Sequence, residues 1–154
     1  MKKWLVCLTV VFCMGASMFS AFAADSTQII LNGELCEIPE GYGRVFVQDA
    51  RTYVPVRFVT EQLGCAVTWD ESDNLVVIST NDMSDFYILQ SGSRFMLHQK
   101  IGMPASPRIE MDVEMYYDEA ECRNYIPVRF LAEAMGYTVD WNQETETVSL
   151  TKAE

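Results

Sequence analysis

The side chains that could carry chemistry are few in this 154-residue chain, which has a single histidine, His98. Copper is bound by His, Cys and Met side chains, so a Cu(I) site would have to combine His98 with Met96 and Met103. A serine or cysteine nucleophile needs a histidine base, and no serine stands in a G-x-S-x-G elbow. We therefore predict no catalytic residue and no cofactor, and a small hydrolase would need an acid or a serine beside His98.

Residues 110–121 are rich in carboxylates and contain Glu110, Asp112, Glu114, Asp118, Glu119 and Glu121. The first three alternate with apolar residues over 109–115, so we expect an acidic-faced strand there. Oxygen ligands brought together by a strand and the adjacent loop suit a hard cation such as calcium. Runs of charge are more often solvated faces. Cation binding, of calcium or copper, with Glu110, Asp112, Glu114 and Asp118 as candidate ligands, is therefore the alternative function.

One stretch of the chain occurs twice, because residues 53–79 match residues 125–151 without gaps at an offset of 72. A self-match of this length indicates a duplicated folding unit. The shared residues include five pairs that we expect to be structural: Pro55/Pro127, Arg57/Arg129, Glu61/Glu133, Gly64/Gly136 and Trp69/Trp141.

Each copy predicts a short helix followed by two strands. Proline fits the first turn of a helix, and glycine ends a helix in the left-handed conformation. The Arg and Glu four residues apart form an intrahelical ion pair in this interpretation. The next residues alternate with a period of two, which places Trp69 and Trp141 in the core. Upstream strands, with Asn32-Gly33 as a hairpin turn, would complete an antiparallel sheet around each helix.

The motif YVPVRFxxExLGxxVxW, with the Asn32-Gly33 turn upstream, resembles the copper amine oxidase N-terminal-like domain. This family is a stalk module of secreted and surface proteins of Gram-positive bacteria, distinct from the catalytic domain. The resemblance implies an α+β fold of two tandem units, each a small antiparallel sheet wrapped around one short helix. The expected units are residues 24–80 and 81–154.

The first residues read as a signal peptide. Lys2 and Lys3 precede an uncharged run, and Ala21-Phe22-Ala23 supplies small residues for cleavage after Ala23. The alternative is an uncleaved membrane anchor. Without Lys2 and Lys3 the basic residues fall from 11 to 9 against 22 acidic ones, a net charge of −13. So acidic a chain disfavours nucleic acid as a partner.

Three cysteines follow the cleavage site: Cys36, Cys65 and Cys122. An odd number leaves at least one thiol unpaired or available between molecules. We expect Cys65 to be a small buried apolar residue, and a bridge between Cys36 and Cys122 remains open.

A binding surface is expected in segments that the two copies do not share. Tyr42, Phe46, Tyr116 and Tyr117 are the aromatic candidates there. The leading hypothesis is a secreted, non-enzymatic stalk-type module, extracellular or associated with the bacterial cell wall, without stable membrane insertion after cleavage. It would serve as a spacer or as a binding surface for a protein or a cell-wall glycan.

Overall fold

The computed structural model describes residues 27–153, and the predicted signal peptide lies outside them. These residues form three sheets and two short helices, an α+β fold. Sheet A has the order β12-β13-β1-β2, with bounds Tyr137–Asn142, Thr147–Lys152, Gln28–Leu31 and Glu34–Cys36. Sheet B has the order β10-β11-β4-β3, with bounds Tyr116–Asp118, Arg123–Pro127, Arg51–Pro55 and Phe46–Gln48. Sheet C has the order β5-β6-β7-β8-β9, with bounds Cys65–Asp70, Leu75–Thr80, Asp85–Gln90, Phe95–Lys100 and Ile109–Glu110.

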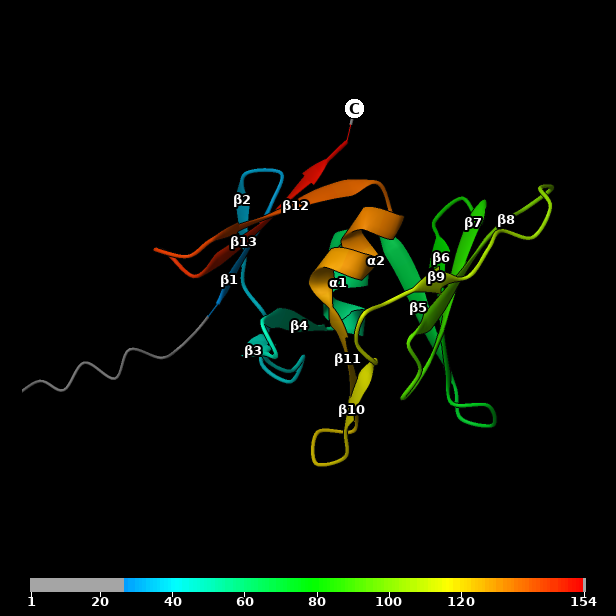
Figure 1. The fold of residues 1–154 in the computed structure, drawn as a ribbon, viewed down its shortest axis with the longest axis horizontal. Helices are drawn as coiled ribbons and strands as arrows, with labels where there is room; N and C mark the ends of the chain where they lie inside the picture. Colours follow the sequence, from blue (N-terminus) through cyan, green and yellow to red (C-terminus); the bar gives the residue numbers. More distant parts are fainter. Residues whose placement is uncertain (1–26, 154) are drawn as a thin grey trace, which may run out of the picture.

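The two helices, α1 (Val56–Gln62) and α2 (Val128–Ala134), lie between sheets A and C, as Figure 1 shows. Pro55 and Pro127 are the residues just before each helix, one position earlier than the first turn. Each helix ends near a glycine in the left-handed region, with φ of +76° at Gly64 and +80° at Gly136. The repeated proline and glycine therefore delimit the helices, as their conformational preferences predict.

Sheet B joins the two halves of the chain about a local twofold axis. β4 and β11 pair antiparallel, with Tyr125 opposite Pro55, Ile126 opposite Val54 and Pro127 opposite Tyr53. Because each of these residues is 72 positions from its repeat partner, the axis passes between Val54 and Ile126. Both side chains are fully buried. The repeat thus pairs with itself as two subunits of a symmetric dimer would.

The strands are shared between the halves, unlike the expected single sheet around each helix. Each of the three sheets contains strands from both sides of residue 80. In sheet C, β7 pairs antiparallel with β6, whereas in sheet A β1 pairs parallel with β13. The reason is that the hairpin after each helix leaves an edge strand, and a strand from the other half satisfies its free backbone groups.

The core lies between the helices and the three sheets. It includes Phe58 and Val59 of α1, Leu131 of α2, and the inward residues of the sheets. The inward positions expected in the strands after the helices are confirmed, because Val76, Ile78, Val148 and Leu150 are buried. No helix within residues 27–153 is long and apolar enough to cross a membrane.

The strand expected over residues 109–115 is shorter in the structure. Only Ile109–Glu110 pairs, with Phe95 and Met96 of β8, and the chain then becomes irregular. Met111 and Met115 are nevertheless fully buried. The alternation of apolar and acidic residues in this segment therefore reflects buried methionine side chains beside sheet C, and the prediction of a strand over the whole segment is wrong.

Candidate binding pocket

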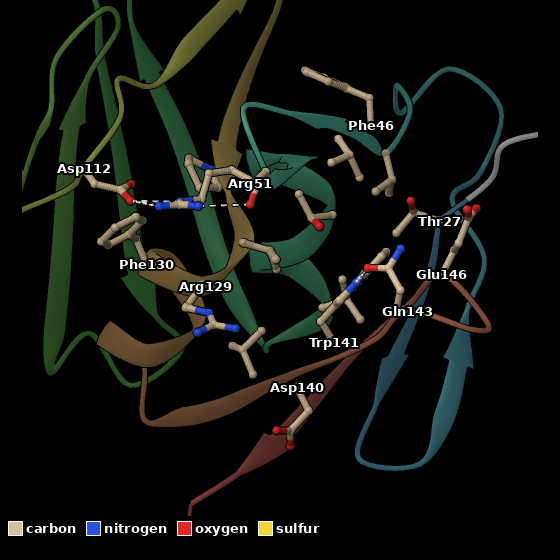
Figure 2. A pocket seen from close by; sticks show the side chains of 18 residues that line it. Thr27, Phe46, Arg51, Asp112, Arg129, Phe130, Asp140, Trp141, Gln143 and Glu146 are labelled. Carbon is tan, nitrogen blue, oxygen red and sulfur yellow. Dashed lines mark hydrogen bonds and ion pairs between the residues drawn. The ribbon is translucent and has the colours of Figure 1, made fainter.

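A pocket of about 910 Å³ lies between the two halves of the chain and is called here the Trp141 pocket. β3 supplies one wall, and the start of α2 with β12 and β13 supplies the others (Figure 2). Its aromatic and aliphatic lining includes Phe46, Val47, Phe130, Val139, Trp141 and Val148. Its polar lining includes Thr27, Arg51, Asp112, Arg129, Asp140, Gln143 and Glu146.

Trp141 corrects an expectation, because it lies at this pocket with 36 % of its surface exposed and not in the core. Its indole Nε1 donates a hydrogen bond to Oε1 of Gln143, at 3.0 Å. β12 is an edge strand of sheet A, so the inward face at this end of the strand borders the pocket. The repeat partner Trp69 is half-buried and packs against the core.

An ion pair between the two halves lies at one end of the pocket. Arg51 of β4 donates from Nε to Oδ2 of Asp112, at 2.9 Å, and a second nitrogen contacts the same oxygen. These hydrogen bonds hold the pKa of Asp112 below its ordinary value. Arg129, at the start of α2, is exposed beside the pocket, and no ion pair of this residue occurs within 27–153. The pocket therefore presents one neutralised pair and one available guanidinium.

A smaller pocket of about 610 Å³, called here the Trp69 pocket, is the counterpart in the other half. Trp69, Glu71 and Asn74 line it, and each stands 72 residues before a residue that lines the Trp141 pocket: Trp141, Gln143 and Glu146. The two edge strands of sheet B occupy equivalent positions in the two halves as well. Phe46 on edge strand β3 pairs with Tyr53, and Tyr116 on edge strand β10 pairs with the equivalent Tyr125.

Residues 114–117 form one wall of the Trp69 pocket. Met115 lines it and is almost fully buried. The Met115 carbonyl accepts a hydrogen bond from Gly92 N, and the Met115 amide donates to Ser93 O. This segment is thereby fixed to the turn between β7 and β8, so the two halves have one open pocket and one shallow pocket.

The structure brings two of the four aromatic candidates together, because the rings of Phe46 and Tyr116 meet edge-on with centres 6.1 Å apart. Phe46 stacks on Tyr53 with a ring-centre distance of 5.2 Å and lines the Trp141 pocket. Tyr116 and Tyr117 are both partly exposed and line the Trp69 pocket. Tyr42 instead packs edge-on against the core residue Phe58, outside both linings.

Three carboxylates of the acidic segment, Asp112, Asp118 and Glu121, pair with arginines of the first half. Arg44 contacts Asp118 at 3.2 Å and also contacts Glu121, which accepts a hydrogen bond from the Tyr125 hydroxyl. Asp112 is held by Arg51. Within residues 27–153 no three His, Cys, Asp or Glu side chains gather as a metal site would require. The proposed cation ligands Glu110, Asp112, Glu114 and Asp118 therefore do not form a common site in this part of the chain.

His98 is bonded to a carboxylate and not to a nucleophile. Its Nε2 lies 2.8 Å from Oδ1 of Asp85, while the Ser84 hydroxyl donates to Oδ2 of the same aspartate. The aspartate thus stands between serine and histidine, an order in which the histidine cannot deprotonate the serine. Met96 is fully buried and Met103 is exposed, so the copper set is divided as well.

One further expectation differs from the structure, and the question left open about the cysteines is answered by it. Arg57, Glu61, Arg129 and Glu133 are all exposed, and neither helix contains the expected Arg–Glu ion pair among the described residues. Within the same residues, Cys36, Cys65 and Cys122 are all free thiols, so the Cys36–Cys122 bridge is not formed. Burial raises the pKa of the Cys65 thiol, which is half-buried.

Residues 105–154 match the family model of the copper amine oxidase N-terminal domain. This domain is a non-catalytic, stalk-type module, and the match covers the second of the two repeats. No curated protein and no solved structure matches the chain.

Sequence reasoning missed the polar residues that complete the pocket. Thr27, Arg51, Gln143 and Glu146 stand in strands and turns without a motif of their own. The available signal was the repeat. Trp69 and Trp141 are identical in the two copies, whereas the turn residues that follow them differ, so the two copies can present different surfaces around the same tryptophan.

Proposed function

We propose that this protein is a secreted, non-enzymatic module that binds a component of the bacterial cell envelope in the Trp141 pocket. In this proposal residues 24–80 are a divergent second copy of the domain matched by residues 105–154. The observation that carries the proposal is the partly exposed Trp141 at the pocket between the two halves, beside Arg129, which has no ion pair within residues 27–153. An aromatic ring with a few polar groups at a concave site is characteristic of binding pockets.

Binding is favoured over a purely mechanical spacer by the path of the chain. The chain enters at Gln28, which pairs with Thr147, and leaves at the end of β13, Lys152. These points lie on one sheet, and five residues of strand separate them by roughly 17 Å. A folded chain whose ends lie this close adds little length to a stalk.

Catalysis is not part of the proposal. The family model that matches residues 105–154 describes a non-catalytic domain. His98 is bonded to Asp85, and neither pocket lining includes it. A protein or a cell-wall polymer is the proposed partner class, and the negative charge of the chain disfavours nucleic acid.

The test is retention of residues 24–154 on fractions of a Gram-positive cell envelope. Purified wall, wall polymers, membrane and secreted proteins are each incubated with the wild-type chain and with Trp141→Ala. We expect retention on one fraction and at least tenfold weaker retention of Trp141→Ala. Trp69→Ala is the matched control and retains binding. Equal retention of both variants, or no retention on any fraction, refutes the proposal.

A further inference from the structure

We infer that the ligand of the Trp141 pocket is a neutral saccharide chain, an inference that rests on the binding role proposed above. Sugar rings have an apolar face of C–H groups and an edge of hydroxyl groups. The pocket offers a partner for each. The aromatic rings of Trp141, Phe46 and Phe130 suit the apolar face, and the polar side chains of Thr27, Arg129 and Gln143 that line the same pocket suit the hydroxyl groups (Figure 2).

The indole of Trp141 is arranged for stacking. Its only hydrogen-bond donor, Nε1, is already used by Gln143. The surface that remains available is therefore the ring itself, 36 % of the residue being exposed. An aromatic ring whose donor is occupied contributes area and a π face, which suits the C–H face of a sugar.

The polar groups of the pocket suit hydroxyl groups, which donate and accept at once. Arg129 supplies donors and Gln143 supplies both types, whereas the Asp140 carboxylate points away from the other labelled side chains (Figure 2). Arg51 and Asp112 satisfy each other, so this pair forms a fixed polar wall and not a free charge. Donors and acceptors are thus mixed around the opening.

The charge of the chain selects a neutral ligand over an anionic one. The lining contains the carboxylates Asp112, Asp140 and Glu146 against the guanidinium groups Arg51 and Arg129. The whole chain carries a net charge of −11, and long-range repulsion slows the approach of a polyanion. A neutral sugar chain is repelled neither by the carboxylates of the lining nor by the net negative charge of the chain.

A saccharide is also favoured over an extended peptide. Peptides that add to a sheet are held by the free backbone of an edge strand. The Trp141 pocket is lined by residues of six elements, β3, β4, β11, α2, β12 and β13, so it is not the free backbone of one strand edge. The Trp69 pocket is smaller, about 610 Å³, and Met115 forms part of its wall, so within residues 27–153 we expect one such site and a 1:1 stoichiometry.

The test uses residues 24–154 with four probes: N-acetylchitotetraose and cellotetraose as neutral chains, tetragalacturonate as an acidic chain, and an uncharged octapeptide. Calorimetry gives the affinity and stoichiometry. Trp69→Phe leaves Trp141 as the single indole of residues 24–154, so its emission reports stacking directly. Trp141→Phe keeps an aromatic ring and serves with thermal unfolding as the folding control.

We expect 1:1 binding of a neutral tetrasaccharide, a change in Trp141 emission, at least tenfold weaker binding in Trp141→Ala, and at least threefold weaker binding in Arg129→Gln. Tighter binding of tetragalacturonate or of the peptide overturns the inference. So does the absence of saccharide binding when envelope retention still depends on Trp141, a result that leaves the proposed function standing. Loss of both retention and saccharide binding refutes both.

Discussion

Gly43 is the residue at which a single methyl group should report how closely the two halves of the chain pack. It lies in the segment between β2 and β3 and has φ of +100°. A Cβ at this position would lie 2.5 Å from the Tyr125 hydroxyl oxygen, 2.9 Å from Cδ of Arg123 and 3.0 Å from Cγ of Pro55. All three residues belong to the central strands of sheet B, β11 and β4.

Two costs follow for Gly43→Ala. An alanine at this φ is strained by about 1–3 kcal/mol. The overlap with buried groups adds about 1–3 kcal/mol, the usual cost of overpacking. Relief of the overlap would move the Tyr125 hydroxyl, which accepts a hydrogen bond from the Arg44 amide at 3.2 Å. We therefore expect a loss of about 2–6 kcal/mol from a total stability of about 5–15 kcal/mol.

Gly41→Ala is the matched control, because Gly41 has φ of +86° but nothing within 4 Å of its Cβ position. It should carry the backbone cost alone. Urea unfolding of both variants and the wild type, followed by circular dichroism, gives the two free energies of unfolding. The difference between the variants isolates the overlap, about 1–3 kcal/mol. Equal losses would refute the close packing of the loop on sheet B.

Two further predictions concern pH. Burial raises the pKa of Tyr87 to about 12, above the ordinary value of 10.0, and its hydroxyl donates to Ala134 O. The stability from this group is complete below pH 10.0 and is lost as the pH rises toward 12. Tyr87→Phe should therefore be about 1 kcal/mol less stable than the wild type at pH 8, and the two proteins should be equally stable by pH ~11. The midpoints of urea unfolding measure this difference. Hydrogen bonds from Ser84 and then from His98 hold the pKa of Asp85 below its ordinary value of 3.8. Its contribution is present above that value and is lost as the pH falls through the lower folded pKa, so Asp85→Asn should cost about 1–2 kcal/mol at pH ~6 and progressively less toward pH ~2.

Each pH prediction has its own refutation. A constant gap between the wild type and Tyr87→Phe from pH 8 to pH ~11 would mean that Tyr87 titrates alike in the folded and unfolded chains. If the difference in unfolding free energy between the wild type and Asp85→Asn does not change with pH, the hydrogen bonds from Ser84 and His98 do not stabilise the carboxylate of the folded chain.

The helices and hairpins could be predicted because their signals are local. Proline and glycine restrict φ at their own positions, so Pro55, Gly64, Pro127 and Gly136 mark the helix ends whatever the rest of the chain does. The change of period after each glycine likewise predicted β5 and β12. These features need no knowledge of which segments meet.

The candidate site could be predicted only in part. Phe46 was chosen because it lies outside the repeat, and it does line the Trp141 pocket. Trp141 was assigned to the core, since alternation tells which face of a strand a side chain occupies but not whether that face is covered at its end. Arg51 and Asp112 lie 61 residues apart, and no pattern in either segment indicates the other.

The sequence by itself determined the elements: the duplicated helix-and-hairpin unit, its boundaries, and its inward-facing residues, because these depend on conformational preference and periodicity over a few positions. Only the tertiary structure decided the partners. β1 pairs with β13 across 119 residues, three carboxylates of the acidic segment pair with arginines of the first half, and Trp141 is partly exposed at the pocket between the halves. These outcomes depend on which edges and charges remain unsatisfied after the local elements have formed, and that is a property of the assembled chain.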